Sequence, residues 1–127
     1  MFLKGAITAL VTPMKENGDI DFDSLENLIN FQIESGISAI VAVGTTGESA
    51  TIDFKDHMRL IESFVKISNK RIPIIAGTGA NSTDEAITLT KSAESSGADA
   101  ALLVSPYYNK PPQEGIFEHH MKIADEV

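Results

Sequence analysis

The chain has 127 residues, of which 43% are hydrophobic and 22% are charged, as in one ordinary globular domain with its own core. Its formal net charge of -8 disfavours a nucleic-acid binder, because such proteins need clustered lysine and arginine to neutralise phosphates. The absence of cysteine excludes a disulfide scaffold, a thiolate metal site and a cysteine nucleophile, and it favours a reducing, cytoplasmic location. The apolar run at 6–11 is too short to span a membrane.

The first predicted unit is a strand over residues 6–11, followed by a turn at 16–19 and a helix that begins near Asp21 or Asp23. Gly36 lies where a glycine commonly ends a helix. The buried face of this helix is predicted from apolar side chains at helical spacing, namely Leu25, Leu28, Ile29 and Ile33.

The second predicted strand covers residues 39–43 and leads through a short loop into a helix. Its predicted buried side consists of Phe54, Met58, Ile61 and Val65. The third strand covers 72–76, and the helix after it is opened by Ser82 with Glu85 three residues on, which is a capping-box signature. The fourth strand covers 100–104 and is followed by a loop at 105–112 and a helix that runs to Val127.

Strand, loop and helix recur at a period of roughly 30 residues, which indicates βαβ units and a parallel sheet. The nearly continuous apolar strands predict that both faces of the sheet are covered. Hydroxyl side chains follow each strand and should gather at the carboxyl edge, where α/β enzymes place their chemistry. These are Thr12, Thr45, Thr46, Thr78 and Ser105. Half of an eight-stranded barrel and a small doubly wound sheet both fit this pattern.

The segment 42–50 is the most informative loop. A strand stops at Thr45 and Thr46, which Gly44 and Gly47 bracket, so that hydroxyls and backbone N–H groups can converge on a small carboxylate or carbonyl. The alternative is that glycine and threonine serve only to turn and cap the chain.

Four segments resemble the dihydrodipicolinate synthase family, within the pyruvate-dependent aldolases and lyases that include N-acetylneuraminate lyase. They are residues 5–13, 44–51, 74–81 and 105–111. The resemblance implies an α/β fold of the TIM (β/α)8 barrel class, in which residues 1–127 form the first four βα units of a single barrel domain. It also implies a Schiff-base condensation of pyruvate with aspartate semialdehyde in the diaminopimelate route to lysine, without a cofactor, in a homotetramer built as a dimer of dimers.

By this resemblance, Thr46 holds the pyruvate carboxylate, Thr45 belongs to a hydroxyl relay, and Tyr108 is the relay tyrosine that reaches into a neighbouring subunit. An effector site for lysine is implied at Ala50, His57, Asn81, Glu85 and Tyr107. Phe54 departs from the family's lysine-sensitive members, which often carry histidine at this position, and this puts lysine inhibition in doubt.

The imine-forming lysine of the family has no counterpart in the matching segments, so the 127 residues alone are predicted to be inactive. A substitute would need an apolar pocket or a neighbouring cation to lower its pKa. Only Lys110 lies in a loop on the expected active edge, and its neighbours are polar residues or proline.

No metal site is expected. His119 and His120 are adjacent on a helix and point about 100° apart, so they cannot chelate one ion together, and both are predicted at the surface or at an interface. Asp19, Asp21 and Asp23 lack the glycine and glutamate of a calcium loop and are interpreted as helix-capping residues.

Two further functions remain open from the sequence. One is a non-catalytic half-barrel that self-assembles or binds a ligand. The other is a sibling aldolase or lyase that acts on another 2-oxo acid, because pyruvate recognition is shared across the group.

Overall fold

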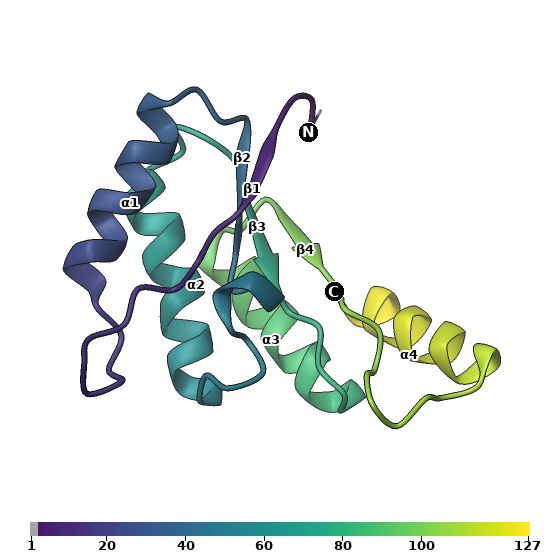
Figure 1. Ribbon diagram of the computed structural model, residues 1–127. Helices are drawn as coiled ribbons and strands as arrows, with labels where there is room; N and C mark the ends of the chain where they lie inside the picture. Colours follow the sequence, from purple (N-terminus) through teal and green to yellow (C-terminus); the bar gives the residue numbers. More distant parts are fainter. Residues whose placement is uncertain (1–2) are drawn as a thin grey trace.

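Residues 3–127 are described by a computed structural model, in which four parallel strands form one sheet in the order β1-β2-β3-β4 (Figure 1). The strands are β1 (Ile7–Ala9), β2 (Ala39–Ala42), β3 (Ile74–Gly77) and β4 (Ala100–Leu102). Each strand pairs with the next one along the chain, and the order never reverses. A doubly wound sheet reverses its strand order, so this alternative is excluded and the topology is that of a barrel segment.

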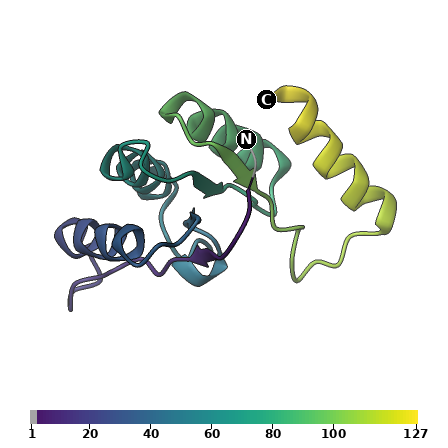
Figure 2. The same cartoon turned by 90° about the horizontal axis from the view of Figure 1, so that it is seen from above.

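The helices follow one another along one side of the curved sheet and form an arc around the strands (Figure 2). They are α1 (Phe22–Glu34), α2 (Phe54–Ser68), α3 (Thr83–Ser96) and α4 (Gln113–Glu126), with the short 3-10 helix η1 (Thr45–Gly47) after β2. Within residues 3–127, no helix is long and apolar enough to cross a membrane.

The strands are shorter than the apolar runs that predict them. Val43, the predicted last residue of the second strand, has a φ of +53° and is not extended, so that β2 ends one residue earlier, at Ala42. The prediction that both faces are covered is confirmed for β2 and β3, whose residues are all buried. It is wrong for the edge strands, where Ile7 is 39% and Leu102 is 51% exposed, because each edge strand has a neighbour on one side only.

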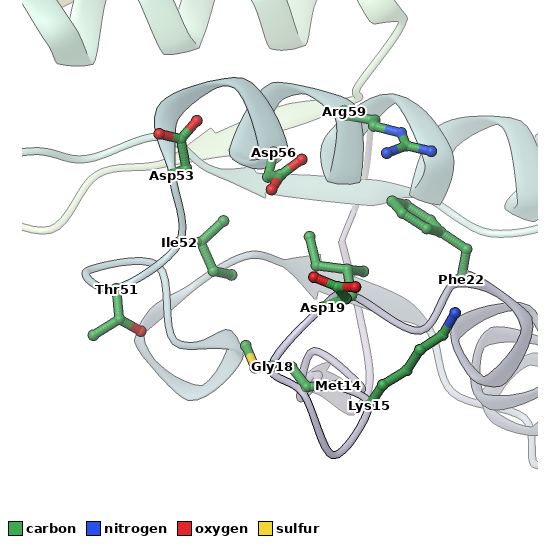
Figure 3. A pocket seen from close by; sticks show the side chains of 11 residues that line it. Met14, Lys15, Gly18, Asp19, Phe22, Thr51, Ile52, Asp53, Asp56 and Arg59 are labelled. Atoms are coloured by element: carbon green, nitrogen blue, oxygen red, sulfur yellow. The ribbon is translucent and has the colours of Figure 1, made fainter.

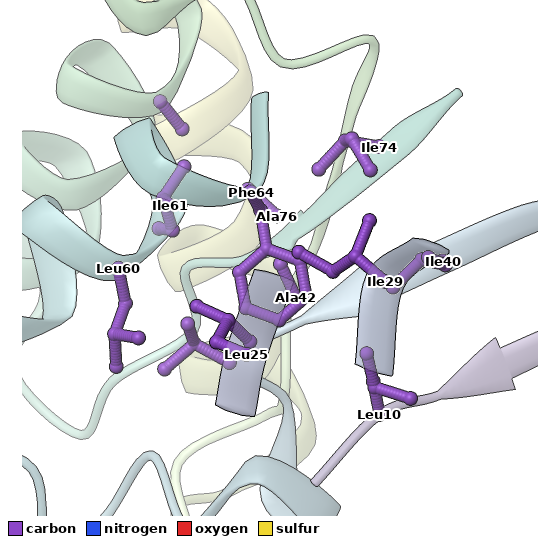
Figure 4. Close-up of a cluster of buried hydrophobic side chains, with 12 residues drawn as sticks. Leu10, Leu25, Ile29, Ile40, Ala42, Leu60, Ile61, Phe64, Ile74 and Ala76 are labelled. Atoms are coloured by element: carbon purple, nitrogen blue, oxygen red, sulfur yellow. The ribbon is translucent and has the colours of Figure 1, made fainter. Parts of the chain in front are cut away.

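The main core lies between the outer face of the sheet and helices α1 and α2 (Figure 4). Phe64 is fully buried there and packs with Leu25 and Ile29 of α1 and with Ile40 and Ile74 of the strands. The opposite face carries a second, smaller cluster of Ala39, Val41 and Ile75. Alternate strand residues therefore point to opposite faces, as the two-residue period of a strand requires.

Helix ends fall where the sequence predicts them. Asp21 caps α1 by accepting a hydrogen bond from the Ser24 N–H at 3.0 Å, and Ser82 caps α3 by accepting from the Glu85 N–H at 3.3 Å. Gly36, just after α1, has a φ of +80°, which is the left-handed conformation expected of a terminating glycine.

The predicted buried face of α2 is partly wrong. Ile61 is buried, but Phe54, Met58 and Val65 are only half-buried. The fully buried positions are His57, Leu60, Ile61, Phe64 and Ser68. The prediction thus left out the apolar Leu60 and Phe64 as well as His57 and Ser68, whose polar groups are hydrogen-bonded inside the structure.

Candidate functional site at the carboxyl edge of the sheet

Thr45 and Thr46 lie on an unusual turn directly after β2. Val43, fully buried, and Glu48 have φ values of +53° and +62°, whereas Gly44 has an ordinary φ of -77°. Left-handed backbone is unfavourable for a β-branched residue, so the packing around Val43 must hold it there. The two non-glycine residues thus provide the reversal of the chain, and both threonine side chains are left exposed.

Gly47, the glycine after the threonine pair, is needed because the neighbouring backbone lies too close for a side chain to fit without a shift, and not because of a left-handed backbone. A Cβ on Gly47 would lie 3.1 Å from the Leu10 carbonyl oxygen and 3.2 Å from the Thr12 hydroxyl. The Thr12 hydroxyl is buried and donates to the Gly47 carbonyl oxygen at 2.7 Å. The segment that follows β1 therefore holds the turn that carries the threonines.

Thr45 shares a cavity of about 300 Å³ with Tyr107, between η1 and the loop after β4. Val104, Ala50 and Glu48 also line this cavity. Thr46 is not among the residues that line it. In the described residues 3–127, neither threonine hydroxyl is engaged in a side-chain hydrogen bond. Both are therefore free to donate to a carboxylate or to exchange protons with a ligand.

The loop after β4 is fixed through Asn81. Its side-chain oxygen accepts from the Tyr107 N–H at 2.7 Å, and its amide nitrogen donates to the Tyr107 carbonyl oxygen at 3.2 Å. Tyr108 follows with a φ of +71° and a side chain that is 97% exposed. The loop is thus anchored at Tyr107 while the Tyr108 ring projects away from the chain.

The five residues of the expected effector site lie together. A second cavity, of about 180 Å³, is lined by all of them: Ala50, His57, Asn81, Glu85 and Tyr107. Phe54 also lines this cavity, so the position that departs from the lysine-sensitive pattern lies at the same place. Ser49 borders both this cavity and the one that contains Thr45.

His57 is 4% exposed, and its Nε2 lies 2.7 Å from the Gly77 carbonyl oxygen. Because a carbonyl only accepts, Nε2 carries the proton and Nδ1 of the neutral ring is an acceptor. Burial lowers the pKa of His57, although the bond to Gly77 and the nearby Glu85 carboxylate oppose this shift. The cavity therefore presents a neutral imidazole and the carboxylate of Glu85.

The other hydroxyls at this edge have structural partners. Thr78 is fully buried, with its hydroxyl 2.9 Å from that of Thr90. The Ser105 hydroxyl is exposed and lies 3.0 Å from Nε2 of His120. Of the five hydroxyls expected to gather at this edge, Thr45 and Thr46 are thus the two without a partner in the described chain.

The two adjacent histidines are predicted at the surface or at an interface, and this is wrong for His119, which is 6% exposed and is buried within the chain, between α3 and α4. Its Nδ1 lies 2.9 Å from the Thr83 hydroxyl, and its Nε2 is buried without a partner within residues 3–127. If the neutral ring carries its proton on Nδ1, that N–H donates to the Thr83 hydroxyl. The unpartnered Nε2 is then an acceptor and not a buried N–H donor. Burial and the neighbouring His120 both lower the pKa of His119.

A larger cavity of about 560 Å³ lies away from the threonines, between the segment 14–20 and the start of α2 (Figure 3). Asp53 at its edge caps α2 by accepting from the Lys55 N–H, and the Arg59 guanidinium stacks over the Phe22 ring at 4.3 Å. Helix capping and cation–π packing account for these groups. The described residues contain no group of three histidine, cysteine, aspartate or glutamate side chains placed to hold a metal ion.

All eight lysines of the chain are exposed. None of them lies in the apolar pocket that a Schiff-base lysine requires. Lys110, on the loop of Tyr108, has a φ of +46° and is surrounded by solvent.

Two residues at this site have no functional signal in the sequence. Val43 belongs to an apolar run that predicts a strand, and nothing in residue type indicates its left-handed backbone. Gly77 is visible as a glycine after a strand, but only the structure places it against the turn of the threonines.

Four parallel βα units in sequential order, with hydroxyls at the carboxyl ends of the strands, define part of a TIM barrel with its candidate site at the usual edge. A model of the Dihydrodipicolinate synthetase family matches residues 2–127, and the chain belongs to this family. The family predicted from the sequence is confirmed.

The chain is 57% identical over 125 residues to the 4-hydroxy-tetrahydrodipicolinate synthase of Saccharophagus degradans, covering 98% of this chain and 43% of that protein. It matches the dihydrodipicolinate synthase of Acinetobacter baumannii, solved in complex with pyruvate, with a TM-score of 0.96 and 56% identity over 99% of this chain and 43% of that one. It also matches the dihydrodipicolinate synthase of Cyanidioschyzon merolae, solved with lysine bound, with a TM-score of 0.94 and 42% identity. This match covers 98% of this chain and 43% of that one. The chain thus spans about 43% of the length of these relatives.

Proposed function

We propose that these residues are the N-terminal portion of a 4-hydroxy-tetrahydrodipicolinate synthase, which condenses pyruvate with aspartate semialdehyde through a Schiff base on the route to lysine. The observation that carries the proposal is the free pair of hydroxyls at Thr45 and Thr46, set at the carboxyl edge of a barrel segment that is 57% identical to synthases of this name. The complete protein is a homo-oligomer in this proposal.

The proposed chemistry assigns one task to each residue. Thr46 donates to the pyruvate carboxylate, Thr45 passes protons during imine formation, and Tyr108 extends the relay into the site of a neighbouring subunit. Hydroxyl groups suit this task because they transfer protons without carrying a full charge into a dry pocket. The exposed position of Tyr108 supports a role outside its own subunit.

The imine-forming lysine is proposed to lie outside residues 1–127, since none of the eight lysines here is buried. The test is to incubate the purified chain with pyruvate, reduce with borohydride and measure the mass. No adduct is expected on the chain, and one pyruvyl group is expected on the complete synthase. A stoichiometric adduct on a lysine of this chain would overturn the assignment of the lysine, and no adduct on the complete protein would overturn the proposed function.

The 180 Å³ cavity is proposed to bind lysine as an effector of the same enzyme. A carboxylate at Glu85 suits an ammonium group, and the neutral His57 ring supplies a hydrogen-bond acceptor. Calorimetric titration of the complete protein with lysine tests this assignment. Glu85→Gln should weaken lysine binding, and unchanged affinity in this variant would contradict it.

A further inference from the structure

Three consecutive contacts connect the His57 cavity to the threonine pair. The first is the hydrogen bond from Nε2 of His57 to the Gly77 carbonyl oxygen, at 2.7 Å. It joins α2 to the last residue of β3, and His57 is also a wall of the cavity.

The second contact lies between Gly77 and the end of β2. A Cβ on Gly77 would lie 2.7 Å from the Val43 carbonyl carbon and 2.8 Å from the Gly44 nitrogen, closer than the 3.0 Å that real Cβ atoms respect. The atoms that it would meet belong to the backbone, which cannot rotate away as a side chain can. The Gly77 peptide therefore lies in direct contact with the backbone of Val43 and Gly44.

The third contact is covalent, because Thr45 follows two residues after Val43. Val43 has its left-handed φ of +53° under the constraint of its packing, so its conformation depends on the neighbours that enforce it. A small cavity of about 30 Å³ has Val43, Gly44 and Thr45 on one side and Gly77 and Gly79 on the other. The turn at residues 43–45 therefore has free space beside it and can move by a small distance.

We propose that His57 is a positioning residue for Thr45 and Thr46, acting through the Gly77 carbonyl and the left-handed Val43. This inference rests on the proposed function for its consequence in pyruvate binding, but the mechanical link itself does not.

The test compares His57→Leu, which removes the donor, with His57→Gln, whose amide can still donate to Gly77. Met58→Leu, a half-buried neighbour on the same helix, is the control. The readout is the methyl NMR signals of Val43, Thr45 and Thr46 in the chain. His57→Leu should shift all three, and His57→Gln and Met58→Leu should leave them in place. Unchanged threonine signals in His57→Leu, or equal shifts in His57→Gln, would overturn the proposal.

A second measurement needs no variant and decides the matter if His57→Leu does not fold. In the wild-type chain, protonation of His57 at Nδ1 leaves the Nε2–H donor in place but makes its bond to the Gly77 carbonyl oxygen charge-assisted and shorter. The methyl signals of Thr45 and Thr46 should therefore follow the titration midpoint of the His57 ring. Glu85 is the charged group that acts on this ring. Threonine signals that do not follow the His57 midpoint would refute the link.

The consequence for catalysis is measured separately in the complete protein. His57→Leu should raise the KM for pyruvate roughly two- to thirtyfold, in the range known for coupling between sites, and His57→Gln should restore it. If Thr46→Val leaves this KM unchanged, the proposed pyruvate site fails while the NMR test of the link stands by itself.

Discussion

The Thr12 hydroxyl donates to the Gly47 carbonyl oxygen at 2.7 Å, so that the segment after β1 is tied to the last residue of η1. Gly77, the last residue of β3, packs closely against the backbone of the same turn at Val43. The exposed threonines are thus carried on a turn that contacts both the segment after β1 and the end of β3. Such support from rigid elements is what a binding site for a small ligand requires.

Thr12→Val should destabilise the fold by about 1–3 kcal/mol, because a buried carbonyl at Gly47 loses its donor. Urea unfolding of the two proteins measures this difference. Thr88→Val is the control, since Thr88 is an exposed helix residue whose hydroxyl bonds only to Asp84 in the preceding turn. Equal unfolding midpoints for Thr12→Val and wild type would show that the Thr12 bond does not support the turn.

Gly77→Ala and Gly115→Ala should have opposite effects. At Gly77 the new methyl group overlaps backbone atoms, and overpacking of this kind costs about 1–3 kcal/mol. At Gly115, in the first turn of α4, a Cβ would be 3.4 Å from the nearest atom of Pro112, and the loss of backbone entropy in the unfolded chain stabilises by about 0.4–1 kcal/mol. Thermal unfolding of both variants tests the pair. A neutral Gly77→Ala would mean that the strand ends are less tightly packed than described.

Much of this fold could be predicted from the sequence because local patterns decide it. The starts of α1 and α3 could be predicted because Asp21 and Ser82 have side chains that cap helices. The end of α1 could be predicted because Gly36 readily adopts the left-handed backbone that follows a helix. The parallel sheet follows from the βα period. Each of these features depends on residues close together in the chain, which a sequence shows directly.

The features that could not be predicted depend on contacts between distant segments. Val43 has a residue type that favours strands, and its left-handed backbone packs against Gly77, 34 positions later. His119 is polar, yet Thr83 of the preceding helix provides a partner that permits its burial. For the site, sequence resemblance found the residues around His57, but only coordinates bring them to one cavity.

Stability should decrease as the pH falls below about 6.5, the ordinary pKa of histidine. Burial lowers the pKa of both His57 and His119 in the folded chain. Between the lowered and the ordinary pKa, the unfolded chain binds protons that the folded chain does not, so acid favours unfolding, and this loss levels off below the lowered values. Carboxylates such as Asp21, whose pKa is lowered by its bonds to Ser24, contribute only in more acidic solution.

Urea midpoints at pH 7.5, 6.5 and 5.5 measure this dependence. His57→Gln and His119→Gln should each flatten the decline, and the double variant should flatten it further. A decline of wild-type steepness in the double variant would assign the effect to other groups.

Tyr108→Phe should separate catalysis from folding in the complete synthase. The side chain is 97% exposed, so loss of its hydroxyl removes no contact within the described chain and should leave the unfolding midpoint unchanged. Under the proposed relay, kcat should fall by about 10²–10⁴, the range for a lost general acid or base. A coupled assay with pyruvate and aspartate semialdehyde gives kcat, and the borohydride adduct with pyruvate shows whether imine formation itself slows. Wild-type turnover in this variant would remove Tyr108 from the relay, and it would leave the exposed ring with a role in contact between subunits alone.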